Sequence, residues 1–328
     1  MSGVFGSQSS WNSIILLLVV LLTAGCKSPQ RVINSERYYA YECRDIISSF
    51  QLDTVPISTI RHDTMLLTKY TIVDLQLANA FGLIDQLRKY ELLKQRISEE
   101  GDNQQLLMEL LVVTNSLNEI TDIAALEIQN MTDFIECTNL KIGKFKAMVS
   151  KANQRSQNKL STGAIIVGAA ASVLTAGVLV SNDDDLKSGS LFDWLAVASG
   201  VATAYLAIRS NRVNKKVQLD PGKNLIKAIW TQNNNEHLFP ATTWYLLNQK
   251  IEVDDKITTL REIIIYEWQS AENMLADPKH KEYLPTLLAD KGIYNEEMID
   301  LRMDMMESIS IGLDQINRAL YLFNMRRR

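Results

Sequence analysis

Hydrophobic positions along most of the chain recur at the three- and four-residue spacing of helices. Between Thr59 and Glu100 the steps alternate between four and three residues, as in Leu66, Tyr70, Val73, Leu77, Ala80, Ile84 and Leu87. This alternation is the heptad seam of a coiled coil. Gly101 interrupts it, and Asp102 with Gln105 three residues later is typical of the cap of a new helix. The pattern predicts one long helix over Thr59–Glu100, preceded by a shorter one over Glu36–Phe50.

A second and longer seam follows Gly101. Its apolar positions are Leu106, Leu110, Val113, Leu117, Ile120, Ala124, Ile128, Met131, Ile135, Thr138, Ile142, Phe145 and Val149. Two four-residue steps meet at Ala124, a stutter that locally unwinds a supercoil. Because the break at Gly101 is tight, we expect the two long helices to be antiparallel neighbours.

Two apolar segments rich in glycine and alanine come next, Gly163–Val180 and Leu191–Ile208, joined by the polar turn Ser181–Ser190. Each has 18 residues, close to the roughly 20 that a helix needs to cross a bilayer core. Small residues recur every fourth position and would let two helices approach closely: Ala164, Gly168, Ser172 and Ala176 in the first arm, Ala196, Gly200 and Ala204 in the second. The pattern predicts a helical hairpin, either inserted into a membrane or buried in a soluble bundle.

Helical spacing returns after the hairpin. One helix is predicted over Pro240–Ala276, with inward positions Leu247, Ile251, Ile257, Leu260, Ile264, Trp268, Ala271 and Leu275. The last is predicted over Glu296–Met325, with one face formed by Met298, Leu301, Met305, Ile309, Gly312, Ile316, Ala319 and Phe323. This face would close the bundle against the first half of the chain. The predicted fold class is therefore all-α: a bundle of long antiparallel, coiled-coil helices with a central Gly/Ala-rich hydrophobic helical hairpin.

Charge adds an orientation to the hairpin. Cations lie on both sides of it: Lys151, Arg155 and Lys159 before, and Arg209, Arg212, Lys215 and Lys216 after. The turn carries Asp183, Asp184 and Asp185. The base of the hairpin is therefore basic and its tip is acidic. The whole chain has a net charge of -4, which argues against a nucleic-acid partner, because such proteins usually show a strongly basic patch.

The N-terminus has the layout of a targeting segment. A short apolar run, Ile14–Leu22, is followed by Thr23-Ala24-Gly25-Cys26, with small residues at the place of cleavage. This ending resembles a bacterial lipoprotein signal, which implies that Cys26 is lipidated and becomes the new N-terminus. Lys27 after the cysteine would favour the outer membrane, facing the periplasm or the cell surface. Residues 1–12 lack Lys and Arg, so a non-lipidated signal or an uncleaved anchor is the alternative.

These features divide the chain into five parts. They are a signal peptide (1–25), a tether (26–35), a long-helix coiled-coil region (36–160), the hydrophobic helical hairpin (161–210) and a C-terminal helical region that packs on the first half (211–328).

Two cysteines besides Cys26 remain in the expected mature chain, Cys43 and Cys137. An exported protein meets an oxidising compartment, where cysteines tend to pair. Folding at Pro56 and at Gly101 would place both cysteines at about the same height along the middle helix. The sequence predicts a disulfide or a close thiol contact. Two buried free thiols that act as small apolar residues are the alternative.

The search for catalytic chemistry finds no motif. His62, His237 and His280 are scattered without a carboxylate or cysteine at ligand spacing, and no phosphate loop, nucleophile elbow or zinc motif occurs. Asp183–Asp185 lack the alternating oxygen ligands of a calcium loop. We therefore expect no enzyme activity, no metal site and no cofactor.

Long paired helices flanking a hydrophobic hairpin resemble the α-helical pore-forming toxins of bacteria. The resemblance is architectural, covers about residues 59–325 and rests on no sequence motif. It implies a hairpin that inserts into a membrane on oligomerisation. The first hypothesis is thus a lipid-anchored, non-enzymatic envelope protein whose hairpin contacts or enters a membrane, as a pore-forming-like protein or a subunit of a membrane complex. Its partners would be membrane lipid, itself or an envelope protein. The second is a structural lipoprotein that scaffolds an envelope or secretion assembly, with the hairpin buried as packing or oligomer interface.

Overall fold

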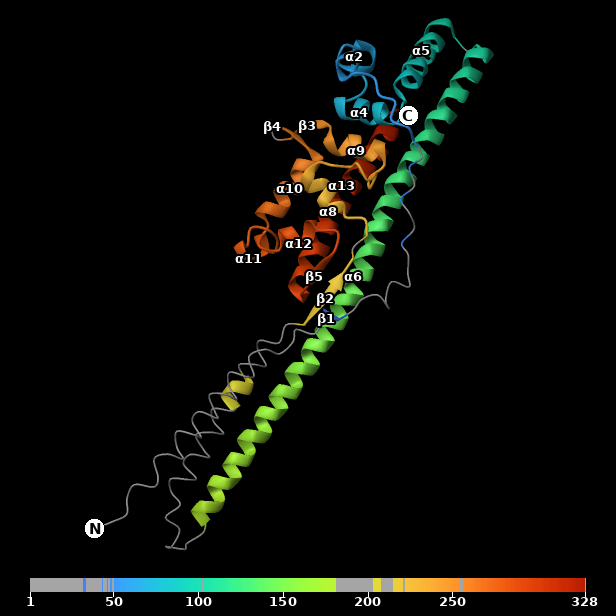
Figure 1. Ribbon diagram of the computed structural model, residues 1–328. Helices are drawn as coiled ribbons and strands as arrows, with labels where there is room; N and C mark the ends of the chain where they lie inside the picture. Colours follow the sequence, from blue (N-terminus) through green and yellow to red (C-terminus); the bar gives the residue numbers. More distant parts are fainter. Residues whose placement is uncertain are drawn as a thin grey trace, which may run out of the picture. The chain divides into compact units, whose positions relative to one another are not determined.

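The computed structural model describes residues 32–33, 43, 46, 48, 50–101, 103–180, 203–207, 215–220, 222–253 and 256–327 (Figure 1). The chain divides into two compact units. The first comprises residues 1–33 and 156–216, and the second comprises residues 34–155 and 217–328. The described residues of both units are mostly helical.

The first long helix predicted from the heptad pattern is broken. Four helices occupy its place: α2 (Ile57–Arg61), α3 (Thr64–Leu67), α4 (Ile72–Ala80) and α5 (Ile84–Glu100). Asp63 caps α3, Thr71 and Asp74 form a capping box at the start of α4, and Gly82 has a φ of +68° between α4 and α5. Caps and a left-handed glycine end helices locally. The prediction of one helix over Thr59–Glu100 was wrong because these signals outweigh the heptad spacing.

The short helix predicted over Glu36–Phe50 is also corrected. Cys43, Ile46, Ser48 and Phe50 are not helical, and the other positions of that range lie outside the described residues. Phe50 instead places its ring edge-on against Phe81, with the ring centroids 5.2 Å apart. The non-helical Phe50 therefore packs at the C-terminal end of α4.

The second seam forms α6 (Gln104–Val180), a helix of 77 residues. Its start is capped by Asn103, whose Oδ1 accepts from the backbone N–H of Gln105 at 2.9 Å; Asp102 lies outside the described residues. Every predicted seam position from Leu106 to Val149 is buried except the half-buried Leu110 and Ile120. The seam is therefore confirmed.

The last helix, α13 (Glu296–Arg327), closes the second unit as expected. Arg327 donates to Asn118 near one end of α13, and Asn153 donates to Glu296 Oε2 at 3.3 Å near the other. Residue numbers rise along α6 as they fall along α13, so the two helices are antiparallel (Figure 1). The predicted apolar face of α13 is buried from Met298 to Phe323, with Ala319 half-buried.

The all-α prediction is wrong in part, because the described residues include small β-sheets. The expected helix over Pro240–Ala276 is replaced by α9 (Ala241–Asn248), β3 (Lys250–Val253), β4 (Lys256–Thr259) and α10 (Leu260–Ser270). β3 and β4 pair antiparallel, with Lys250 opposite Thr259, because β-branched residues are frequent there. Ile257, expected to point inward, is 74% exposed. β2 (Lys216–Leu219) also pairs antiparallel with β5 (Gly292–Tyr294), and β1 is Val32–Ile33.

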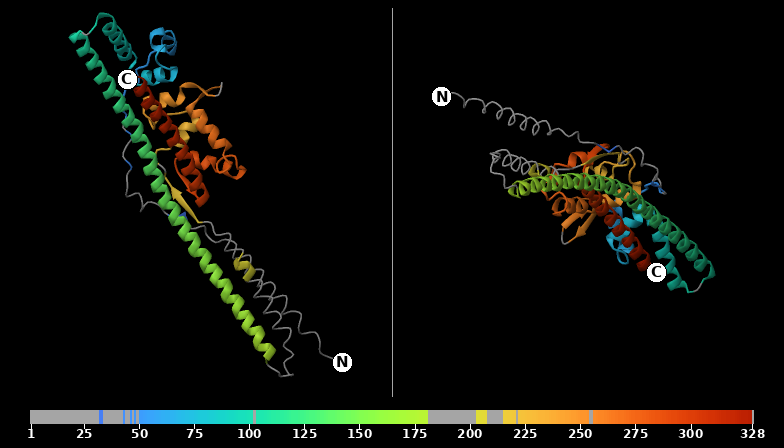
Figure 2. Two further views of the ribbon diagram at one scale, coloured as in Figure 1. Left: turned by 180° about the vertical axis from the view of Figure 1, so that it is seen from behind. Right: turned by 90° about the horizontal axis from the view of Figure 1, so that it is seen from below.

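Three further short helices complete the second unit: α8 (Leu225–Thr231), α11 (Pro278–Lys281) and α12 (Leu284–Leu288). Figure 1 and the left view of Figure 2 show the short helices gathered around α13. The largest fully buried side chains there include Trp268, Tyr294, Phe239 and Phe323. The core of this unit therefore lies where α13 meets α4, α8, α10 and α6.

The space around the backbone differs between two helical glycines, Gly312 and Gly143. A Cβ on Gly312 of α13 would lie 2.8 Å from Ile264 Cδ1 of α10, whereas one on Gly143 of α6 would lie 3.8 Å from Met303 Cε. Gly312→Ala is therefore expected to be less stable than Gly143→Ala by about 1 to 2 kcal/mol, because overpacking costs free energy. Both changes gain the same helix propensity. Urea unfolding of the two variants measures the difference, and equal midpoints would contradict the close approach of α10 and α13.

Candidate anchoring and membrane-contact site

The first arm of the hairpin is part of α6. The helix continues without interruption through Gly163–Val180, so the predicted arm is helical along its whole length. Ala164 is 8% exposed, whereas the next two side chains, Ile165 and Ile166, are 71% and 63% exposed. One face at the start of the arm is thus covered and the adjacent face carries bare branched aliphatic side chains.

The two arms touch near the base of the hairpin. A Cβ on Gly163 would lie 3.8 Å from Cδ1 of Leu206, which belongs to a helical stretch over residues 203–207. Ala204 in that stretch is exposed. The described contact between the arms therefore uses Gly163 and Leu206 rather than Ala204.

Most of the predicted small-residue stripe lies beyond what the structure describes. Gly168, Ser172 and Ala176 are in α6, but the surroundings of their side chains are outside the described part. Ala196 and Gly200 lie outside it entirely, as do Cys26 and the acidic turn Asp183–Asp185. The packing of these residues stays a prediction.

Charges are segregated along α6. Residues 104–140 contain six acidic and no basic side chains, and residues 141–159 contain six basic and no acidic ones. Lys146 pairs with Asp300 of α13 at 2.6 Å, which raises the pKa of Lys146. Lys151, Arg155 and Lys159 are exposed and four residues apart, so they share one face. The basic end of α6 therefore comes directly before the apolar arm. Counting the charged residues of 104–140 separately from those of 141–159 would also have revealed the acidic segment from the sequence.

Cys43 and Cys137 form a disulfide with their Cα atoms 5.9 Å apart. The bond attaches the chain before α2 to α6, 17 residues after Cys26. Sequence reasoning placed the two cysteines together by assuming an unbroken helix over Thr59–Glu100. The bond forms although that helix is broken, and Cys43 itself is not helical.

Two arginines at the end of α13 contact other helices of the second unit. Arg326 Nη1 lies 2.6 Å from Asp74 Oδ1, which joins the end of α13 to the start of α4. Arg327 is 2% exposed and lies over the ring of Tyr90, whose hydroxyl donates to the Arg327 carbonyl at 2.9 Å. These two arginines therefore tie α13 to α4, α5 and α6; Arg328 lies outside the described residues.

Asp74 has two structural roles, and its removal is expected to lower the free energy of unfolding by about 2 kcal/mol. Its side chain is 2% exposed, completes the capping box of α4 and pairs with Arg326. Loss of a cap costs about 1 kcal/mol, and the ion pair adds less than a fully buried one because Arg326 is 42% exposed.

Asp85→Ala is the matched control for Asp74→Ala. Asp85 also pairs with an arginine, Arg88 at 2.8 Å, but its side chain is 91% exposed. Chemical denaturation should show a change below about 0.5 kcal/mol for Asp85→Ala. Equal effects of the two substitutions would contradict the role assigned to Asp74.

Titratable side chains elsewhere in the described residues make structural contacts. The described residues contain no group of three or more His, Cys, Asp or Glu side chains arranged to hold a metal ion. His280 Nδ1 lies 2.8 Å from the carbonyl of Met274, and its Nε2 lies 3.3 Å from Glu297. Arg302 is fully buried, donates to the Leu287 carbonyl at 3.2 Å, and has its pKa lowered by burial. These contacts fix loops and helices in place.

Within the described part of the chain, no helix meets the length and hydropathy needed for a membrane crossing. No protein-family model, curated protein or solved structure matches the chain. The functional inference therefore rests on the chain's own residues and geometry.

Proposed function

We propose that the protein is a lipid-anchored, non-enzymatic component of a bacterial cell envelope, and that its apolar hairpin contacts or enters a membrane. The observation that carries this proposal is the start of the first arm, where α6 presents Ile165 and Ile166 bare. Exposed clusters of large apolar side chains mark contacts with membranes or with other proteins. Membrane lipid is the partner of this site, and the function requires neither a cofactor nor nucleic acid.

The charge of α6 supports a lipid surface at this place. Lys151, Arg155 and Lys159 share one exposed face directly before the bare isoleucines. A cation close to an anionic membrane surface contributes about 1 kcal/mol of attraction. Basic side chains at the headgroups followed by aliphatic side chains are the order in which a helix meets a bilayer from the water side.

Chain lengths allow both attachments to reach one membrane. The 17 residues from Cys26 to Cys43 span at most about 58 Å when fully extended. Along α6, Gly163 lies 26 residues after Cys137, a rise of about 39 Å. Because the disulfide joins these two paths at Cys137, a lipid on Cys26 and the apolar arm can meet the same leaflet.

Membrane fractionation with an alkaline wash tests the proposal. Cys26→Ser removes the proposed lipid, and Ile165→Asp with Ile166→Asp makes the start of the arm polar. We expect the Cys26→Ser chain to stay partly in the washed membrane fraction, and the combined variant to become soluble. The matched control adds Leu126→Asp and Leu140→Asp to Cys26→Ser, because these leucines are 62% and 70% exposed on the same helix but outside the arm.

Three results would oppose the proposal. Complete release of Cys26→Ser by the wash would exclude stable membrane contact by the hairpin. Equal release by the isoleucine and leucine substitutions would show a general effect of charge on α6. Lipid labelling that persists after Cys26→Ser would exclude Cys26 as the anchoring residue.

A scaffold is the second candidate function, favoured by the contact between the arms. Ala164 is 8% exposed and Gly163 faces Leu206, so the hairpin has packing of its own and can act as an oligomer interface. In this case the lipid on Cys26 holds a structural protein in an envelope or secretion assembly. Light scattering of the detergent-solubilised protein distinguishes the two: loss of an oligomer in Ile165→Asp with Ile166→Asp favours the scaffold.

A further inference from the structure

One face of α6 is open along most of the second unit. In Figure 1 and in the left view of Figure 2, the helices α4, α8, α10 and α13 lie along one side of α6. On another face, from Val112 to Gln154, an exposed side chain recurs after every three or four residues. We call this row of side chains the outer stripe. Its spacing is the one with which a helix meets a second helix in a coiled coil.

Large aliphatic side chains occur on the outer stripe once in every two heptads. Val112, Leu126 and Leu140 are 14 residues apart and are 65%, 62% and 70% exposed. Single exposed apolar side chains are normal on protein surfaces, so these three by themselves do not identify a partner. Leu140 has a special place, because it is the last residue of the acidic segment 104–140 and the basic segment 141–159 follows it.

The charges of the outer stripe change sign at Leu140. Asp133 and Glu136 precede it, Lys144 and Lys151 follow it, and all four are exposed. Along α6, no residue of opposite charge lies within four positions of any of them, although opposite charges at that spacing stabilise a helix. The helix dipole does not account for the order, because it acts on the first and last turns and both ends of α6 are more than 20 residues away. The charge order is therefore of little benefit to α6 itself.

A second copy of α6 that runs in the opposite direction has the complementary order. When two outer stripes cross antiparallel at Leu140, residues equally far before and after Leu140 lie opposite each other. Glu136 then faces Lys144 of the second copy, and this contact occurs twice. Asp133 lies between Lys144 and Lys151 of the second copy, because the residue opposite it is Ala147. One surface thus complements itself, as a twofold interface requires.

A parallel pair has the wrong charges. It would place Asp133 against Asp133, Glu136 against Glu136 and Lys144 against Lys144, and like charges that face each other across an interface are unfavourable. Only the antiparallel direction brings the acidic half of the stripe to the basic half.

We propose that two copies of this protein associate antiparallel through the outer stripe of α6, with Leu140 at the twofold axis and contacts between Glu136 and Lys144 on both sides of it. The paired stretch from Leu126 to Gln154 is about 42 Å long at about 1.5 Å per residue. Polar residues in a helical seam fix its register and reduce its stability, so the pair is reversible and sensitive to salt. The apolar arm lies outside this stretch, and the proposal goes beyond the membrane contact.

Sedimentation of the full chain in mild detergent at low salt tests the proposal through a charge exchange. Glu136→Lys and Lys144→Glu each bring like charges together twice, and each is expected to weaken the dimer by about tenfold or more. An equal mixture of the two variants is expected to form a heterodimer as tight as the wild-type dimer, because every lysine again faces a glutamate. Lys151 and Arg155 are left unchanged, since they belong to the basic face assigned to lipid headgroups.

Asp314→Lys is the matched control. It makes the same change of charge at an exposed position of α13 and should leave the dimer as tight as that of the wild type. Raising the salt to about 1 M, where charges are screened beyond about 3 Å, should also dissociate the wild-type dimer.

Four results would overturn the proposal: a monomeric wild type at low salt, equal effects of Glu136→Lys and Asp314→Lys, a mixture that does not associate, or a dimer indifferent to salt. Ile165→Asp with Ile166→Asp should keep this dimer. An oligomer that is lost in that variant and kept in Glu136→Lys would assign association to the hairpin instead. Membrane fractionation of Glu136→Lys should match the wild type, so failure here does not bear on the proposed membrane contact.

Discussion

Replacing Cys43 and Cys137 together by serine is expected to lower the free energy of unfolding by about 4 to 5 kcal/mol. The bond joins residues that are 94 positions apart, and the chain-entropy model assigns about 4.7 kcal/mol to a loop of about 100 residues. Urea unfolding of the oxidised protein and of the double variant measures the difference. The wild type in the presence of a reductant should approach the stability of the double variant.

Two controls distinguish the stabilisation that comes from closing the loop from other effects of the substitutions. The double variant should not respond to the reductant, because it has no bond to lose. Cys26→Ser should keep the stability of the wild type, since Cys26 is the first residue of the tether and lies outside this loop. A loss below about 1 kcal/mol on removing the bond would contradict the stabilisation expected from closing so long a loop.

Leu117→Ala is expected to destabilise the protein by about 3 kcal/mol. Leu117 lies in the seam of α6 and is 0% exposed, and truncating a buried leucine removes apolar contacts and leaves a cavity. Leu126→Ala, on the same helix but 62% exposed, is the matched control and should change the stability by less than about 0.5 kcal/mol. Denaturation midpoints compare the two variants, and a similar loss in both would mean that the seam of α6 does not face the core.

Periodicity and local chemistry were enough to predict several elements. The seam from Leu106 to Val149 and the last helix follow from the 3.6-residue repeat, because a helix that buries one face must place apolar residues on it. The pairing of Cys43 with Cys137 followed from cysteine chemistry in an oxidising compartment. The helical first arm followed from an apolar run that contains no proline.

Other features depended on competing local signals. Between Thr59 and Glu100 the heptad spacing favoured one long helix, whereas the caps Asp63 and Thr71 and the left-handed Gly82 favoured breaks. Four shorter helices formed. Around Ile251 and Ile257 the helical spacing competed with β-branched residues, and a hairpin formed. Which of two competing local preferences a segment follows depends on the surfaces against which it packs, and a short stretch of sequence does not contain that information.

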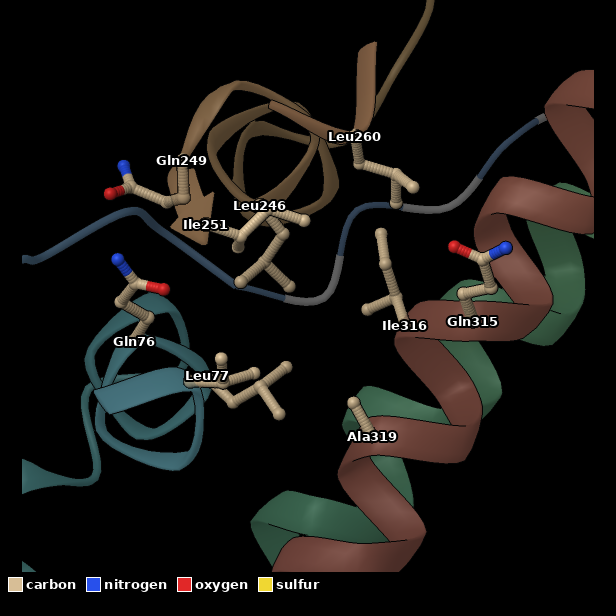
Figure 3. Close-up of a pocket in the computed structure, with 10 residues that line it drawn as sticks. Gln76, Leu77, Leu246, Gln249, Ile251, Leu260, Gln315, Ile316 and Ala319 are labelled. Atoms are coloured by element: carbon tan, nitrogen blue, oxygen red, sulfur yellow. The ribbon is translucent and has the colours of Figure 1, made fainter. Parts of the chain in front are cut away.

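The amino-acid sequence by itself therefore determined the helical character, the apolar first arm and the basic residues that come before it, since each depends on residues within a few turns of one another. Tertiary structure alone decided the burial of Arg302, the pairing of Asp74 with Arg326 and a small cavity lined by Gln76, Gln249 and Gln315 (Figure 3). Gln76, Gln249 and Gln315 are far apart in the chain, and no local pattern marks them as neighbours. A cavity is space that packed elements leave unfilled, so it exists only after distant segments have met.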